Sequence, residues 1–237
     1  MRPLTISKEL AQKVGRLRFR SPVAKVYNPL DYAFGAFSTY LRQFGDGPRE
    51  VLLIGMNPGP WGMAQTGIPF GEVNVVRGWL GIRDGIKPPV DQHPKRPILG
   101  LACKRSEVSG RRIWGWARDA FGTPEKFFRR FMVLNYCPLC FMEESGKNLT
   151  PDKLPARERE PLFAACDGAL RDLAEYYRPK FVVAVGGFVE ARATTALNGL
   201  PVTIGRILHP SPASPLANKG WAKQAMEQMR RMGIVQR

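Results

Sequence analysis

Two nearly uncharged segments of this chain carry polar side chains that could hydrogen-bond a substrate. In the first segment, Asn57 follows the apolar run Val51–Gly55 and is followed by proline, so its carboxamide projects from a stiff loop. In the second segment, His209 follows the apolar run Val202–Leu208 and is one of only two histidines, the other being His93. A turn-forming asparagine and a capping or core histidine are the structural alternatives, and the latter is the interpretation we adopt for His93.

The elements that position these side chains follow from the apolar pattern. Short apolar runs predict four buried strands, at Val51–Gly55, Phe131–Asn135, Phe181–Gly186 and Val202–Leu208. Helical spacing predicts helices at Leu30–Phe44, Arg111–Phe121, Ala156–Tyr177, Phe188–Leu197 and Lys219–Met232. Strands that alternate with helices predict an α/β fold with a central four-stranded, mainly parallel sheet flanked by helices. The loops that hold Asn57 and His209 should then meet at the carboxyl edge of that sheet.

Length and composition favour one folded domain over residues 1–237, with a helical lead over about residues 1–48. The chain has 237 residues, of which 44% are hydrophobic, and no apolar run reaches the length of a membrane helix. The start lacks the pattern of a secretory signal, so we expect an intracellular protein, in the cytoplasm or nucleoid of a bacterium or the nucleus of a eukaryote. We expect a monomer.

Four cysteines are too few for a disulfide scaffold of this size. Cys137 and Cys140 form a C-x-x-C pair, but no second pair and little histidine accompany it. We therefore predict no metal and no cofactor. Glu72 is the only carboxylate of the segment that contains Asn57, and a structural bond to the backbone is its expected role.

The charge balance favours a polyanionic partner. The chain has 36 Lys and Arg against 20 Asp and Glu, which gives a formal net charge of +16. The positive charge gathers in residues 1–50, 77–130 and 201–237, whereas Val51–Val76 contains no lysine or arginine. A basic surface that serves solubility and an anionic membrane surface are the alternatives.

Four motifs together resemble a known family. They are GMNPGPWGMAQTGIPFGE at Gly55–Glu72, LNYCPL at Leu134–Leu139, SGKNLTPDKLPARERE at Ser145–Glu160 and HPSPASPLANKGW at His209–Trp221. In order and spacing they closely resemble the single-strand-selective monofunctional uracil-DNA glycosylases of the uracil-DNA glycosylase superfamily. The resemblance implies a base-excision repair enzyme that flips uracil or a 5-substituted uracil out of single- or double-stranded DNA, hydrolyses its N-glycosidic bond and leaves an abasic site. No lysine precedes Lys219 in either active loop, which agrees with hydrolysis without a Schiff base.

The resemblance also implies roles for single residues. Asn57 would position the attacking water, which needs placement more than deprotonation because the transition state resembles an oxocarbenium ion. His209 would hydrogen-bond uracil O2 and stabilise the charge on the leaving base. Asn135 would donate to uracil O4 and accept from N3–H, a pattern that cytosine reverses, and Phe70 would stack on the base. Gly59 would leave room beside the uracil 5-position for a substituent or for water, and Met56 would line the same pocket.

A further set of residues is expected to hold DNA. In the matching motifs of the family these positions grip the backbone or form the wedge that enters the base stack, and they are Ser145, Lys147, Asn148, Lys153, Arg157, Arg159, Ser211, Pro212, Ala213, Ser214 and Lys219. Ala213 departs from the family's pattern, which has a basic residue there in animal members, so the strength of the wedge is open.

Two other functions compete with this one. A non-catalytic basic DNA-binding protein on the same scaffold would explain the charge but not the two uncharged loops. A nucleotide-binding α/β enzyme is weakened because no phosphate-binding G-x-x-x-x-G-K-[ST] motif follows any strand.

Overall fold

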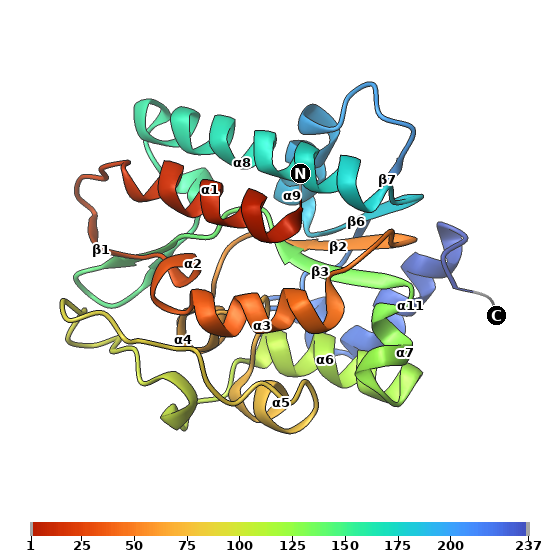
Figure 1. The fold of residues 1–237 in the computed structure, drawn as a ribbon, viewed down its shortest axis with the longest axis horizontal. Coiled ribbons are helices and arrows are strands. Elements are labelled where there is room, and N and C mark those ends of the chain that lie inside the picture. The colour runs from red at the N-terminus through yellow and green to blue at the C-terminus, as the bar shows by residue number, and fades with distance from the viewer. Residues whose placement is uncertain (1, 236–237) are drawn as a thin grey trace.

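A four-stranded parallel sheet forms the centre of the molecule (Figure 1), whose computed structural model describes residues 2–235. Its strands are β2 (Val51–Gly55), β3 (Phe131–Asn135), β6 (Phe181–Val185) and β7 (Thr203–Ile207). They lie in the order β3-β2-β6-β7, and every neighbouring pair is parallel. All residues of β2 and β6 are buried, which is why these strands have no polar face in the sequence. The predicted α/β fold and its four central strands are confirmed.

Helices cover both faces of this sheet (Figure 1). On one side lie α1 (Pro3–Gly15), α8 (Ala156–Tyr177) and α9 (Gly187–Ala196). On the other side lie α3 (Phe34–Phe44), α6 (Val108–Phe121), α7 (Pro124–Phe128) and α11 (Trp221–Arg231). The remaining short helices are α2 (Pro29–Tyr32), α4 (Met63–Thr66), α5 (Val73–Gly78), α10 (Pro215–Asn218) and the 3₁₀ turns η1 (Gly100–Ala102) and η2 (Pro151–Lys153).

The register of β2 and β3 brings two predicted site segments together. Gly55 at the end of β2 lies opposite Asn135 at the end of β3. The pairing continues into the loops, because Tyr136 N donates to the Gly55 carbonyl and Cys137 N donates to the Met56 carbonyl, each at 2.8 Å. Backbone hydrogen bonds alone therefore hold the loop after β2 against the loop after β3.

A second, antiparallel sheet was not expected from the sequence. It contains β1 (Val23–Tyr27), β4 (Cys140–Glu143) and β5 (Asn148–Leu149) in the order β1-β4-β5. The prediction of a helical lead over about residues 1–48 is thus wrong at β1. This strand pairs only with β4, more than 100 residues later, and three of its five residues are at least partly exposed, so its local pattern is weak.

The predicted helix Leu30–Phe44 is also interrupted. It divides into α2 and α3 at Ala33, whose backbone leaves the helical region. Ala33 is fully buried, and an added Cβ on Gly67 would lie 2.8 Å from its side chain. The segment that follows α4 thus passes very close to Ala33. A break in the helix at Ala33 fits this packing better than a continuous helix would.

The cysteines are all free and buried. Burial raises the pKa of Cys140 and of Cys166, so these thiols stay protonated and are poor metal ligands. Within residues 2–235, no cluster of three or more His, Cys, Asp or Glu side chains is placed to hold a metal ion. In the same range, no helix is both long and apolar enough to span a bilayer.

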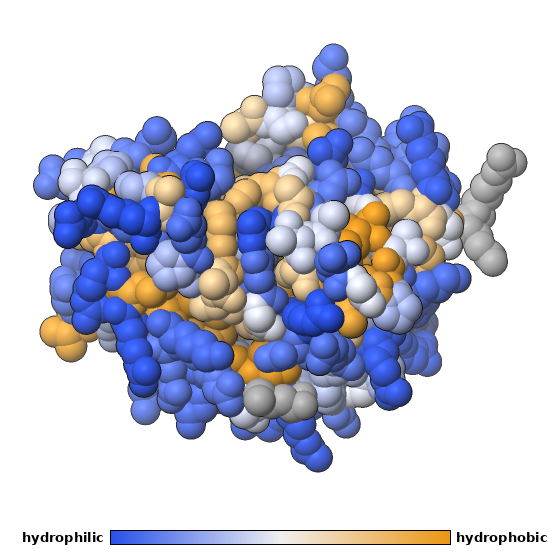
Figure 2. All heavy atoms as spheres, turned by 90° about the horizontal axis from the view of Figure 1, so that it is seen from above, coloured by the Kyte–Doolittle hydropathy of each residue, from blue (hydrophilic) through white to orange (hydrophobic). Residues whose placement is uncertain are grey.

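The surface shown in Figure 2 is largely hydrophilic. On the face in Figure 2, hydrophilic side chains cover most of the area and smaller apolar patches lie between them. Of the large apolar side chains, Val90, Leu99 and Leu216 are exposed, and Leu216 belongs to α10, beside the His209 loop.

Candidate active site

A pocket of about 450 Å³ opens at the carboxyl edge of the parallel sheet, where the sequence predicts the site. The predicted residues that line it are Met56, Asn57, Gly59, Phe70, Asn135, Asn148, His209, Ser211 and Pro212. The other lining residues, which nothing in the sequence indicated, are Pro60, Met63, Glu107, Ser109 and Thr150. Segments far apart in the chain therefore converge on one cavity.

Asn57 is held by the loop that follows β3. Its Nδ2 donates to the Leu139 carbonyl at 3.1 Å. Because a carboxamide directs its two polar atoms about 120° apart, this bond turns Oδ1 away from Leu139 as a hydrogen-bond acceptor. The orientation of the amide is thus set by the neighbouring loop.

Phe70 is presented by a turn with an unusual backbone. Its φ of 53° lies in the left-handed region, which non-glycine residues rarely adopt. Two contacts hold the turn: Trp114 Nε1 donates to the Pro69 carbonyl at 3.2 Å, and an added Cβ on Gly110 would meet the Phe70 carbonyl at 2.0 Å. Helix α6 therefore presses on the backbone of the turn and fixes the direction of the aromatic ring.

The floor of the pocket depends on the absence of a side chain at Gly55. A Cβ there would lie 2.3 Å from Asn135 Oδ1 and 2.5 Å from Phe70 Cζ. The amide of Asn135 and the ring of Phe70 therefore approach each other directly above the end of β2. Asn135 Nδ2 lies 3.2 Å from the sulfur of Met63, and its Oδ1 is buried without a hydrogen-bond partner among the described residues.

His209 is oriented as a neutral hydrogen-bond donor. Its Nδ1 accepts from Ser211 N at 3.1 Å, so the ring proton belongs on Nε2. Burial lowers its pKa below the ordinary 6.5, which also favours the neutral ring. By contrast, His93 is buried away from this pocket, and its Nδ1 accepts from Lys95 N, which confirms the structural interpretation given to it.

Arg112 of α6 secures the loop that carries His209. Its guanidinium donates to the carbonyls of Pro210 and Ser211 at 2.9 and 3.4 Å, and to Asn218 Oδ1 at 2.8 Å. The loop thus has a fixed relation to α6, the same helix that supports Phe70. The sequence offered no signal for this contact, because Arg112 is one of many basic residues in its segment.

The residues predicted to hold DNA lie around the pocket or farther out. Asn148, Ser211 and Pro212 line it, and Ser145 and Lys147 belong to the turn between β4 and β5. The others do not line it: they lie in η2, in the first turn of α8 and on either side of α10, and are Lys153, Arg157, Arg159, Ala213, Ser214 and Lys219. Glu72 caps α5 by accepting from Val75 N, as expected of a structural carboxylate.

Two further cations stand near the rim. Trp61 follows the pocket residue Pro60, and the guanidinium groups of Arg96 and Arg105 each lie 5.0 Å from the centre of its ring. Arg96 also approaches the turn at Gly146, next to Lys147. These side chains place positive charge beside the cavity.

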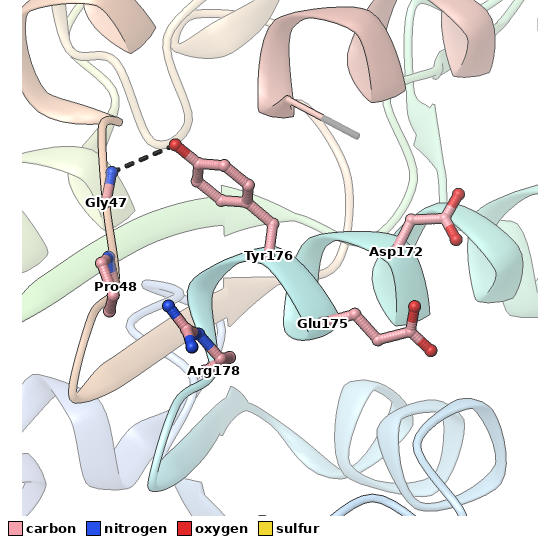
Figure 3. A pocket seen from close by; sticks show the side chains of 6 residues that line it. All are labelled: Gly47, Pro48, Asp172, Glu175, Tyr176 and Arg178. Atoms are coloured by element: carbon pink, nitrogen blue, oxygen red, sulfur yellow. Dashed lines mark hydrogen bonds between the residues drawn. The ribbon is translucent and has the colours of Figure 1, made fainter.

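A larger hollow, of about 660 Å³, lies at the opposite edge of the sheet (Figure 3). Gly47 and Pro48 precede β2, and Arg178 precedes β6, so this hollow faces the amino ends of the strands. In Figure 3 the Tyr176 hydroxyl meets Gly47 N, at 3.1 Å, while Asp172 and Glu175 point away from them. The polar groups here satisfy one another or face solvent, and no uncharged cluster of donors and acceptors converges on the space. The smaller pocket is therefore the candidate site.

Comparison with known proteins finds one matching family and several relatives of similar sequence. Residues 43–230 match the model of the family described as the uracil DNA glycosylase superfamily. The chain is 50% identical over 234 residues to a single-strand selective monofunctional uracil-DNA glycosylase of Rattus norvegicus, covering 98% of this chain and 83% of that protein. It is 47% identical over 248 residues to the protein of the same name from Mus musculus, covering 99% and 89%.

A solved structure shares the fold. The wild-type SMUG2 protein of Pedobacter heparinus superposes with a TM-score of 0.68 over 96% of this chain and 97% of that chain. At 18% sequence identity, that likeness concerns the architecture alone.

Proposed function

The chain belongs to the uracil DNA glycosylase superfamily, and on that premise we propose how its pocket excises uracil from DNA, with Asn57 and His209 as the catalytic residues. The reaction is hydrolysis of an N-glycosidic bond in DNA repair. One observation carries the assignment to these residues: two side chains more than 150 positions apart line one pocket, and each has one polar atom tied to the protein and another free for a ligand.

Asn57 places the water. Its Nδ2 bond to Leu139 leaves Oδ1 as the acceptor for a water hydrogen, which turns an oxygen lone pair toward the deoxyribose C1′. An amide is too weak a base to deprotonate that water. Cleavage that proceeds through an oxocarbenium-like state needs little deprotonation, so placement supplies most of the benefit.

His209 stabilises the leaving base. A neutral ring with its proton on Nε2 donates one hydrogen bond to uracil O2, where negative charge grows as the glycosidic bond breaks. The donor is fixed before the reaction because Ser211 N holds Nδ1, and Arg112 holds the carbonyls of the same loop.

Asn135 and Phe70 select and hold the base. Phe70 stacks on its face, and Asn135 donates to O4 and accepts from N3–H, which excludes cytosine because that base has the reverse pattern at both atoms. In support, Asn135 Oδ1 is buried without a partner among the described residues, and Nδ2 meets only the weak acceptor sulfur of Met63. A bound base would satisfy both groups.

The basic residues around the pocket hold the DNA backbone. Lys147, Arg96 and Arg105 lie on the rim side where Trp61 and the β4–β5 turn meet, and phosphates are their natural partners. We propose that the protein acts as a monomer on single and double strands. DNA binding should weaken steeply as salt rises, because it depends on contacts between these basic side chains and phosphates.

A single oligonucleotide assay tests this function. A strand with one uracil, incubated with the protein and then heated in alkali, should break at the uracil, and the same strand with thymine there should stay intact. Strands that remain whole in both single- and double-stranded form would exclude a glycosylase. Binding without base release would favour the alternative of a non-catalytic DNA-binding protein.

The rate of uracil release should be flat from pH 8 down to about 6.5 and fall only at lower pH. Burial lowers the pKa of His209 from 6.5, so the ring stays neutral across that range and loses its donor geometry only when it is protonated below it. The measurement is a single-turnover pH–rate profile with enzyme in excess. A rate that climbs as pH drops from 8 to 6 would indicate a protonated imidazole instead. Because burial raises the pKa of Glu107 in the same pocket, the profile should be repeated with Glu107→Gln to assign the step.

A further inference from the structure

A tryptophan with an unused hydrogen-bond donor stands at the rim of the pocket. Trp61 is partly buried and follows Pro60, which lines the cavity. The indole N–H groups of the other four tryptophans each donate to an acceptor atom of the protein. The N–H of Trp61 donates to no atom among residues 2–235, and protein does not enclose it. A donor therefore remains for a ligand beside the pocket.

Two arginines bring positive charge to the same ring. The guanidinium carbons of Arg96 and Arg105 each lie 5.0 Å from the ring centre of Trp61. Neither guanidinium group forms an ion pair with a carboxylate in the described part of the chain, whereas Lys147 Nζ lies 3.9 Å from a carboxylate oxygen of Glu143. Two like charges beside one ring repel each other, and an anion bound to both would remove that repulsion.

The loops that carry these side chains are tied to each other. Gln65 is fully buried, and its Nε2 donates to the carbonyls of Pro60 and Pro97 at 2.9 and 3.0 Å. These two prolines are the chain neighbours of Trp61 and Arg96. The ring and the guanidinium group are thus brought together before DNA arrives, which lowers the entropic cost of binding.

The cluster offers hydrogen-bond donors only. Within residues 2–235, the one hydrogen bond made by the guanidinium groups of Arg96 and Arg105 is from Arg96 Nη1 to the Lys95 carbonyl, at 2.9 Å. An aromatic ring beside a guanidinium group limits its orientations but leaves an N–H edge for a ligand. That edge matches the oxygens of a phosphate, and the indole N–H adds a further donor. Base edges present acceptors and donors together, so a phosphate fits this cluster better than a base edge does.

The cluster also lies where the DNA strand must leave the pocket. When a flipped base enters the cavity, the phosphates of its own strand pass over the rim. We propose that Trp61, Arg96 and Arg105 form a phosphate-binding subsite for one phosphodiester group of the uracil-containing strand, either next to the flipped nucleotide or one position farther along. The inference rests on the proposed function of the pocket. Holding that phosphate limits how far the strand can slide, and so places the sugar of the flipped nucleotide beside Asn57.

A scan with single neutral phosphates tests the subsite. Each single-stranded oligonucleotide carries a stable abasic analogue in place of the uracil nucleotide, and a methylphosphonate replaces one phosphate near it. Affinities are measured by fluorescence anisotropy at one fixed salt concentration, because phosphate contacts depend on salt. With the wild-type protein, one of the positions named above should lose about tenfold in affinity, the low end for a hydrogen bond to a charged group because the site is partly exposed. Its neighbours should lose less.

Replacing the arginines then assigns the sensitive phosphate. In Arg96→Gln and in Arg105→Gln, affinity for the unmodified strand should fall, and the methylphosphonate at the sensitive position should cost at most about threefold, because a cation that met its charge is gone. The matched control is Arg129→Gln, which removes the same charge from an exposed residue at the end of α7, near the amino edge of the sheet. It should keep the tenfold penalty.

Two substitutions of Trp61 test the part played by the ring. Trp61→Leu keeps both cations but removes the ring and its N–H, so the penalty at the sensitive position should shrink as it does in the arginine variants. Trp61→Phe keeps a ring beside the guanidinium groups and loses only the indole donor, so it should retain more of the penalty than Trp61→Leu. A role in folding alone would lower affinity for every strand equally and leave the penalty unchanged.

The outcomes keep the subsite separate from the chemistry. A scan without a sensitive position, or a penalty that Arg96→Gln and Trp61→Leu leave unchanged, overturns the subsite even when the protein releases uracil. Affinity that falls on removal of a flanking base, but not on neutralisation of a phosphate, would mean that Trp61 stacks on a base, which also overturns it. A protein that shows the sensitive phosphate but releases no uracil retains the subsite and overturns the proposed function.

Discussion

Replacing either Asn57 or His209 with alanine is expected to lower the single-turnover rate of uracil release by about 10²- to 10³-fold. Asn57→Ala removes the acceptor that places the water, and His209→Ala removes the donor that meets the developing charge on O2. Both interactions are strongest in the transition state, so the chemical step should suffer far more than binding. Affinity for an oligonucleotide with an abasic site should stay within about threefold of the wild type, because the phosphate contacts involve other side chains.

Matched variants keep this result interpretable. His93→Ala removes the only other histidine, which is buried and accepts a hydrogen bond from Lys95 N. This variant should lower the free energy of unfolding but leave the rate of uracil release by the folded enzyme unchanged. Asn198→Ala removes an exposed asparagine after α9 and should change neither. If both Asn57→Ala and His209→Ala release uracil at the wild-type rate, this pocket is not the catalytic site.

The central strands could be predicted because burial on both faces leaves an unmistakable sequence pattern. Strands β2 and β6 read as unbroken apolar runs, and each ends at the glycine or loop where the structure ends it. Helix α8 has the predicted bounds, since its apolar residues keep helical spacing and Arg178 ends it in the left-handed region. The sequence was therefore sufficient to predict where the carboxyl edge of the parallel sheet lies. It also predicted that the loops carrying Asn57 and His209 meet at that edge.

The small antiparallel sheet could not be predicted in the same way. Strand β5 is two residues long and β4 is four, and neither length supports a local periodicity. Their pairing with β1 depends on contacts between residues more than 100 positions apart. This sheet matters for the site because the β4–β5 turn brings Asn148 to the pocket.

Glu107 shows a different limit of sequence reasoning. It lies in a basic stretch and is the only acidic residue between Asp91 and Asp119, a signal that marks it as unusual without saying where it points. Its place in the pocket arises from the start of α6 against Gly59 and Gly62, which is a tertiary contact. The same holds for Arg112, whose bonds to the His209 loop span about 100 residues.

Gly55→Ala is expected to reduce uracil release by at least about 100-fold without a change to any group that takes part in the chemistry. The new methyl would lie 2.3 Å from Asn135 Oδ1 and 2.5 and 2.6 Å from two ring carbons of Phe70, far inside van der Waals contact. The amide of Asn135 and the ring of Phe70 must then move apart or into the pocket. The base loses the hydrogen bonds from Asn135 and the stacking on Phe70. The measurement is the single-turnover rate on a uracil strand, with affinity for an abasic strand measured beside it.

The abasic strand separates a blocked pocket from a damaged fold. Because it carries no base, its binding needs the backbone contacts but not the space above Gly55, so Gly55→Ala should bind it nearly as the wild type does while failing to release uracil. The control is Gly115→Ala in α6, where a Cβ meets nothing within 4 Å and the helix should gain about 0.5–1 kcal/mol of stability. Equal loss of uracil release and of abasic-strand binding in Gly55→Ala would mean that the floor of the pocket serves the fold and not the base. Undiminished release would mean that the base does not rest on Phe70 and Asn135 at all.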